Sequence, residues 1–186
     1  DDVPTLQDAG ITIATVRSGY NEGWFLNVNP ATAHPAMLDV NVRKAIALAT
    51  DRFSILSDLL LESVNFVPAT PWDGTPPFDS GLDPYPYDPE QAKALLDAAG
   101  WVDSNGDGTR DKDGTELVLR YVTTTRELRK NVQAVVQQQW SLVGIGADAR
   151  KVGIHGLAQR DGARQCEQAP HGERSDEPSR AIDHAD

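Results

Sequence analysis

The most constraining feature of the sequence is the stretch YDPEQAKALLDAAGWVDSNGDGTRDKDGTELVL, which joins a punctuated helix to an acidic, glycine-rich turn and then to a strand. Asp88 is a good N-cap, and Pro89 suits the first helical position. Gln91 can return a hydrogen bond to the backbone of the cap, and Gly100 can supply the left-handed residue that ends a helix. The spacing therefore predicts a helix over residues 89–99.

Composition and charge limit the class of protein. The chain has 186 residues, 39% hydrophobic and 24% charged, which is ordinary for a soluble protein with a core. Its formal net charge of -11 disfavours nucleic acid as a partner, because binding to phosphates needs a basic face. No apolar run approaches the roughly 20 residues that cross a bilayer, so we expect no direct membrane insertion of this segment. The N-terminal DDVPTLQDAG lacks the features of a signal peptide, which favours an interior piece of a longer protein.

Periodicity predicts several elements in the first half of the chain. Residues 11–17 and 24–30 are typical of strands. Asp39 or Asn41 can cap one helix, and Asp51 can cap another. The first helix would bury Val42, Ile46 and Ala49. The proline-rich residues 68–89 should form an ordered loop, because proline disfavours regular hydrogen-bonded structure. Four aromatic side chains would hold this loop: Trp72, Phe78, Tyr85 and Tyr87.

Residues 116–152 are typical of a strand, a helix and a second strand. The strand at 116–123 carries apolar side chains on both faces, which indicates burial on both sides. A helical apolar stripe follows, and Gly144 can end it before a strand at 145–152. This order predicts a parallel βαβ unit with a right-handed crossover. We expect one core to contain Val118, Val122, Leu128, Val132, Val135 and Trp140, together with Leu95 and Leu96.

The order of several motifs resembles the family 5 extracellular solute-binding proteins, the oligopeptide- and dipeptide-binding subunits of ABC importers. The motifs are WFLNVNP, the D-x-x-V-R-x-A-I pattern that begins at Asp39, the Y-D-P-E-x-A-K-x-L-L-x-x-A-G-W block and W-x-x-V-G-I at Trp140. Several spaced motifs in the right order over residues 20–152 are more specific than any one of them. The matching single residues are Asn29, Asp39, Val42, Arg43, Ala45, Ile46, Asp51 and Arg52.

The resemblance implies a fold and a function. The fold would be mixed α/β (α+β), as part of the second lobe of a two-lobed type II periplasmic-binding-protein fold. The chain would be a fragment of the substrate-binding subunit of an ABC transporter that imports oligopeptides, dipeptides or similar small solutes. Such a parent closes two lobes on its ligand, performs no catalysis and needs no cofactor. It would be periplasmic or extracellular, held at the membrane through its own anchor, and would dock on membrane permease subunits.

The same resemblance divides the chain. Residues 1–25 would be the end strands of the first lobe and the hinge crossing, and residues 26–152 a partial second lobe. From His155 to Asp186 the only large aliphatic side chains are Leu157 and Ile182, too few to offset the entropy of ordering the segment at residues 153–186. We interpret them as a disordered or non-native tail, with a folded helix near residues 174–184 as the alternative.

The acidic turn at residues 103–114 places oxygen ligands with the spacing of an EF-hand loop, and Gly108 stands at its sharp sixth position. The candidate calcium ligands are Asp103, Asn105, Asp107 and Asp111. The twelfth position, which needs a bidentate Glu, is Gly114. We favour a loop in which Asp and Asn bond their own backbone, with calcium as the alternative.

A candidate ligand site lies where the strand at 116–123 gives way to a helix. The amide N–H groups at such a helix start, with threonine hydroxyls, can hold an anion such as a peptide carboxylate. The residues are Thr123, Thr124, Thr125 and Arg126, and the resemblance favours a position facing the cleft. The alternative is that Thr125 only caps the helix and that Arg126 and Arg129 are solvated. We favour core positions for the tryptophans, and Trp24 or Trp72 is at most a further candidate contact.

The sequence offers little for an enzyme. It contains no Gly-x-Ser-x-Gly elbow, no phosphate loop and no Cys/His cluster at metal spacing. The rival from another class is a calcium-stabilised structural or adhesion module, for which the acidic turn is the whole case.

Overall fold

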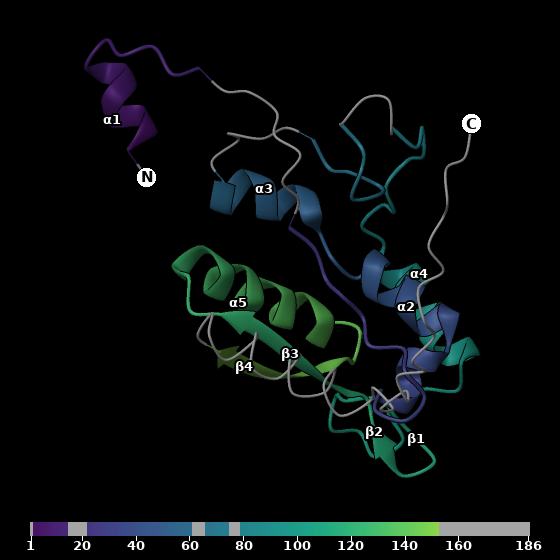
Figure 1. The fold of residues 1–186 in the computed structure, drawn as a ribbon. Coiled ribbons are helices and arrows are strands. Elements are labelled where there is room, and N and C mark those ends of the chain that lie inside the picture. The colour runs from purple at the N-terminus through teal and green to yellow at the C-terminus, as the bar shows by residue number, and fades with distance from the viewer. Residues whose placement is uncertain (1, 15–21, 61–65, 75–78, 153–186) are drawn as a thin grey trace, which may run out of the picture. The chain divides into compact units, whose positions relative to one another are not determined.

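The computed structural model describes residues 2–14, 22–60, 66–74 and 79–152. The helices are α1 (Val3–Asp8), the 3-10 helix η1 (Pro35–Leu38), α2 (Val40–Leu48), α3 (Arg52–Leu60), α4 (Pro89–Ala98) and α5 (Glu127–Ser141), and the strands are β1 (Asp111–Lys112), β2 (Thr115–Glu116), β3 (Val118–Thr124) and β4 (Gly146–Val152) (Figure 1). The fold is mixed α/β, as predicted. None of the helices in these ranges is long and apolar enough to span a bilayer.

Helix α4 has the predicted signals at both ends. The Asp88 carboxylate accepts a hydrogen bond from Gln91 N at 2.8 Å, and Gly100 adopts a φ of 80° just after the last turn. The expected return bond to the cap backbone does not form. Asp88 N donates instead to Leu48 O at 2.9 Å, which attaches the start of α4 to the end of α2. The two helices pack side by side (Figure 1).

The two predicted caps before α2 and α3 are also confirmed. Asp39 Oδ1 accepts from Asn41 N at 2.8 Å, and Asp51 Oδ1 accepts from Ser54 N at 3.0 Å. The predicted stripe of α2 is buried, with Val42, Ile46 and Ala49 each at most 1% exposed.

Strands β3 and β4 form the predicted parallel pair, and α5 packs against β3 (Figure 1). A single core joins this unit to α2 and α4. Its largest fully buried side chains are Ile46, Leu96, Leu117, Ile145, Gln133, Val42, Val136 and Val143. Trp140 belongs to the same core, as predicted, and Leu95 and Val132 pack against it.

The second face of β3 corrects one prediction. Val118 and Val122 remain 37% and 40% exposed, whereas Leu117 and Leu119 are at most 7% exposed. The described residues cover only one face of the strand, so its apolar alternation does not produce burial on both sides. The predicted core set is therefore wrong for Val118 and Val122. Leu128 and Val135 are also absent from the core cluster, in which α5 buries Val136 instead.

The structure also differs from the predicted N-terminal strands and from the predicted aromatic contacts of the proline-rich loop. Residues 11–14 and 22–30 form no paired strand, and residues 15–17 lie outside the described ranges. The loop at 68–89 is irregular, as expected, but the described aromatic side chains do not hold it by burial, because Trp72 and Tyr85 are 65% and 49% exposed. The Asp73 carboxylate organises it instead, accepting bonds from the backbone of residues 69, 70 and 80 at 2.8 to 2.9 Å. Phe78 and the tail after Val152 lie outside the described residues.

Candidate functional site

The predicted anion loop joins β3 to α5. Thr124, the last residue of β3, is 5% exposed, whereas the loop residues Thr125 and Arg126 are exposed. The N-cap position of α5 belongs to Arg126 and carries no side-chain capping bond, so the interpretation of Thr125 as the cap is wrong. The N-cap side chain therefore does not occupy the first turn of α5, and the free amide N–H groups there can donate hydrogen bonds to an anion.

Trp24 lies in an aromatic cluster rather than in the loop itself. Its ring centroid is 5.7 Å from that of Trp140, and its Nε1 donates to the Tyr121 hydroxyl at 3.0 Å. Tyr121 stacks on Trp140 with centroids 5.6 Å apart. Burial raises the pKa of Tyr121, the Trp24 hydrogen bond lowers it by a smaller amount, and the negative charge of Glu22 raises it.

Arg129 connects this segment to the loop, which corrects the alternative in which its side chain is only solvated. It donates to Glu22 Oε1 at 2.7 Å from Nη2, and to Thr124 Oγ1 at 3.4 Å from Nη1. The structure thus brings the segment of Trp24 next to the threonine loop through a side chain one turn into α5. The ion pair joins residues 107 apart in sequence, so no local pattern could reveal it.

Gln133 is a residue of this region that the sequence did not single out. It is 1% exposed in the middle of α5, where a stripe of apolar side chains is expected. Its Nε2 donates to Tyr121 O at 2.8 Å and to Arg150 O at 3.4 Å, which satisfies the buried amide and attaches α5 to both strands. A polar residue within an apolar stripe is the signal that could have found it.

The acidic turn has the backbone-bonded form that the sequence favoured. Asp103 accepts from the N–H groups of Gly106 and Gly108 at 2.7 and 3.0 Å, and Asp107 accepts from Thr109 N at 2.7 Å. The bond from Thr109 is the main reason why the pKa of Asp107 is lowered, with a second contribution from Asn105. In the described residues, no three His, Cys, Asp or Glu side chains are grouped to hold a metal. Calcium at Asp103, Asn105, Asp107 and Asp111 stays an untested prediction.

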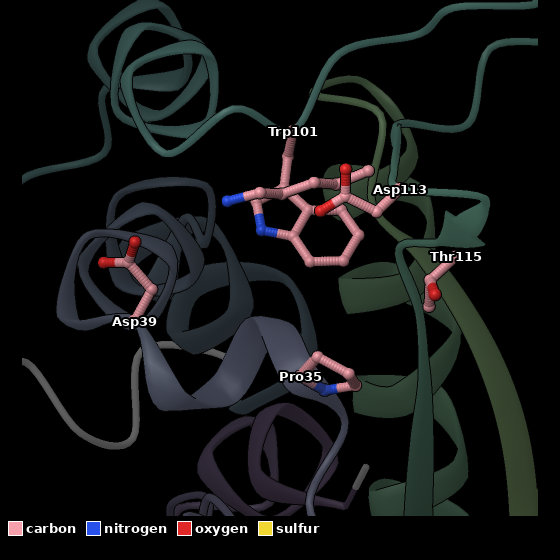
Figure 2. A pocket seen from close by; sticks show the side chains of 6 residues that line it. Pro35, Asp39, Trp101, Asp113 and Thr115 are labelled. Atoms are coloured by element: carbon pink, nitrogen blue, oxygen red, sulfur yellow. The ribbon is translucent and has the colours of Figure 1, made fainter.

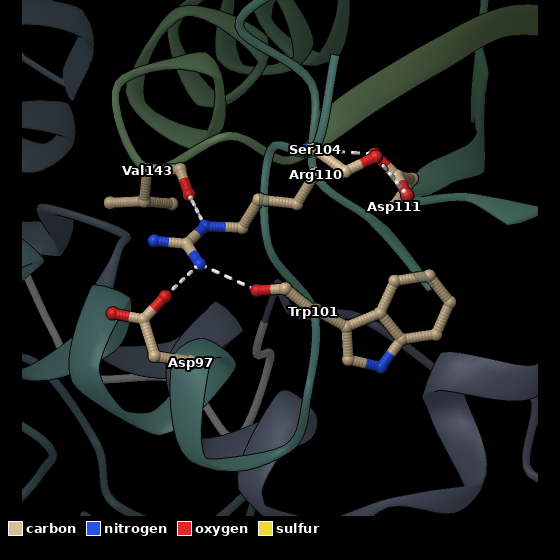
Figure 3. Close-up of polar contacts among 6 residues, drawn as sticks. All are labelled: Asp97, Trp101, Ser104, Arg110, Asp111 and Val143. Carbon is tan, nitrogen blue, oxygen red and sulfur yellow. Dashed lines mark hydrogen bonds and ion pairs between the residues drawn. The ribbon is translucent and has the colours of Figure 1, made fainter. Parts of the chain in front are cut away.

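The end of this turn fastens several elements through Arg110 (Figure 3). Its Nε donates to Val143 O at 2.8 Å, and its Nη1 contacts both Trp101 O at 2.6 Å and the Asp97 carboxylate at 2.5 Å. Cations near helix C-termini are stabilised by the carbonyl groups there. The acidic turn therefore joins α4 to the segment after α5, and its visible role is structural.

Comparisons with known proteins identify the family. Residues 1–165 match the family model described as bacterial extracellular solute-binding proteins, family 5 Middle. The chain belongs to this family. It is 36% identical over 110 residues to the oligopeptide-binding protein AppA of Bacillus subtilis, covering 58% of this chain and 20% of AppA. It is 30% identical over 141 residues to the nickel-binding periplasmic protein of Escherichia coli, covering 70% of this chain and 26% of that protein.

The fold agrees with this assignment. The structure of Bacillus subtilis AppA in complex with a nonapeptide matches at a TM-score of 0.58 and 32% identity, over 66% of this chain and 25% of that one. The type II periplasmic-binding-protein fold predicted from the sequence is confirmed. The chain spans about a quarter or less of the length of these relatives. None of the comparisons supports a calcium-stabilised adhesion module.

Proposed function

We propose that this chain is part of the substrate-binding subunit of an ABC importer for oligopeptides, dipeptides or similar small solutes. The family match over residues 1–165 carries the proposal. Relatives named as oligopeptide-binding and nickel-binding proteins show that the family serves more than one kind of solute. The parent would capture its ligand by closing two lobes, and this chain would supply one wall of the cleft.

The remaining properties of the parent belong to the same proposal. It would perform no catalysis, because transport requires only capture and release. Its partners would be the solute and the membrane permease subunits of the transporter. It would act in the periplasm or outside the cell and be retained at the membrane by an anchor of the parent.

Within this chain, the loop after β3 is the proposed ligand contact. Thr125 and Arg126 are exposed at an uncapped helix start, and the Arg129 side chain holds Thr124 at its edge. Amide N–H groups, hydroxyls and a guanidinium together suit a carboxylate, the group that every peptide carries at one end. Trp24, which is hydrogen-bonded to Tyr121, would contribute apolar contact to the ligand.

Alanine substitution of Thr124, Thr125 and Arg126 in the full-length parent tests the loop. Loss of a charged, hydrogen-bonded contact should weaken peptide binding by about 1 to 3 kcal/mol, measured by calorimetry with a mixed peptide pool. Because Thr124 is buried, the pair Thr125→Ala with Arg126→Ala separates ligand contact from folding. A matched pair on exposed positions elsewhere, Thr12→Ala with Lys44→Ala, should leave affinity unchanged. Equal affinity in the loop pair and the control pair would remove the loop from the binding site.

A further inference from the structure

A cavity lies away from the loop after β3. It has a volume of about 290 Å³ and is lined by Pro35, Asp39, Trp101, Lys112, Asp113 and Thr115 (Figure 2). These residues come from η1, the N-cap position of α2, the segment after α4 and the β1–β2 hairpin. His34 ties two of the walls together, because its Nε2 lies 2.9 Å from Glu116 O and its Nδ1 accepts from Ala36 N.

The hairpin places one carboxylate at the rim. Strands β1 and β2 pair antiparallel with Lys112 opposite Thr115, so Asp113 and Gly114 form the two-residue turn. Both residues have a positive φ, 51° for Asp113 and 75° for Gly114, as a type I′ hairpin turn requires. Asp113 and Trp101 line the same cavity (Figure 2).

The cavity offers hydrogen-bond donors that the described protein does not use. The indole N–H of Trp101 has no partner among the described residues, although the residue is 3% exposed. No fully buried side-chain nitrogen or oxygen in the described ranges lacks a partner, so this N–H must remain reachable from solvent. Lys112 Nζ donates one bond, to Ala99 O at 2.8 Å, and an ammonium group has three N–H groups.

Unused acceptors line the same cavity. One Asp39 oxygen accepts from Asn41 N, and the other has no partner in the described part of the chain. The Asp113 carboxylate and the Thr115 hydroxyl also make no hydrogen bond to any described residue. Among the described residues, Lys112 forms no ion pair with Asp39 or Asp113. The ammonium group and the two carboxylates therefore line the cavity without neutralising one another.

We propose that this cavity binds a free α-amino acid as its zwitterion. The ammonium group would pair with Asp113 at the rim, and the carboxylate would accept from Trp101 Nε1 and Lys112 Nζ. A simple cation or anion would leave one of the two sets unpaired, whereas a zwitterion satisfies both. The exposed ring of Pro35 suits a small apolar side chain. The site is independent of the peptide contact proposed for the loop after β3.

The test uses the full-length parent with ¹⁵N-labelled tryptophan and follows the Trp101 indole resonance, which Trp101→Phe assigns. Glycine and L-alanine should shift this resonance saturably, with a Kd on the order of 1 to 10 mM for so small a ligand. Methylammonium and acetate, each with one charge, should bind at least about tenfold more weakly. Equal binding of acetate alone would make this a simple anion site and overturn the proposal, as would the absence of any shift with glycine.

Variants locate the two charges. Asp113→Asn keeps the turn, because Asn tolerates positive φ, and should weaken glycine binding about fivefold or more. Lys112→Gln should do the same, whereas the exposed controls Asp8→Asn and Lys44→Gln should leave the Kd unchanged. Unchanged affinity in Asp113→Asn would overturn the proposal. Peptide calorimetry on the same samples reports the main cleft separately, so failure of one site is distinguishable from failure of the other.

Discussion

Arg110 and Gly144 lie in contact where the acidic turn meets the segment after α5. Arg110 N donates to Gly144 O at 2.9 Å, and a Cβ built on Gly144 would lie 2.7 Å from Arg110 Cγ. Gly144 also has a φ of 83°, which residues other than glycine rarely adopt. The close contact with Arg110 therefore requires both the positive φ of Gly144 and its lack of a side chain.

Gly144→Ala should destabilise the chain by at least about 2 kcal/mol, because it adds a steric clash to backbone strain. Gly106→Ala is the matched control, since Gly106 has a φ of 78° but no atom within 4 Å of an added Cβ. It should cost roughly 1 kcal/mol from strain alone. Urea denaturation of both variants measures the difference, and equal costs would show that Arg110 does not press on this site.

Arg110→Met should lower the free energy of unfolding by about 2 to 3 kcal/mol, because two carbonyl groups and the Asp97 carboxylate lose a charged donor. Its side chain is only 12% exposed, so solvent cannot fully replace these bonds. Arg120→Met, at an exposed position of β3, should change stability by less than about 0.5 kcal/mol. If both substitutions had the same small effect, the role given to Arg110 would be incorrect.

Trp140→Ala should cost about 3 to 5 kcal/mol, because the ring is 3% exposed and its Nε1 donates to Thr50 Oγ1 at 3.0 Å. Leu142→Ala, two residues later and 60% exposed, should cost well under about 1 kcal/mol. A cost below about 1 kcal/mol for Trp140→Ala in chemical denaturation would place the ring outside the core.

Acid should loosen the loop around Asp73. Hydrogen bonds from Ser80 and Thr70 hold the pKa of Asp73 well below its ordinary value of 3.8. A lowered folded pKa contributes stability that is present above the unfolded value and is lost as pH falls through the folded one. Proteolysis within residues 66–84 should therefore accelerate below about pH 4, and Asp73→Asn should be cleaved faster already at pH 7. Asp58→Asn, on the exposed face of α3, serves as the control. Cleavage of Asp73→Asn at the wild-type rate would argue against this anchor.

Local signals predicted the elements whose causes are local. Asp88 and Gly100 bound α4 in the structure because capping depends on residues a few positions apart. The same logic held at Asp39 and Asp51. The Asp113-Gly114 dipeptide is an equally local signal for a hairpin. It was not used, because residues 103–114 were compared with an EF-hand loop instead.

The rest depends on contacts that sequence periodicity does not contain. Val118 and Val122 alternate like buried residues, yet burial requires a covering layer that the described residues do not supply. The Glu22–Arg129 ion pair and the bonds of Arg110 to Trp101 O and Val143 O arise from chain segments brought together by the fold. The candidate loop could be located from its place between strand and helix, but its neighbours could not.

Calorimetric titration of the full-length parent with a mixed peptide pool, with calcium in a separate run, tests the central claim most directly. We predict saturable binding of one or more peptides by the parent, because both lobes must enclose a ligand to satisfy its polar ends. The 186-residue chain alone should show little or none. Calcium binding without any solute binding in the parent, or equal peptide affinity in the isolated chain, would contradict the account.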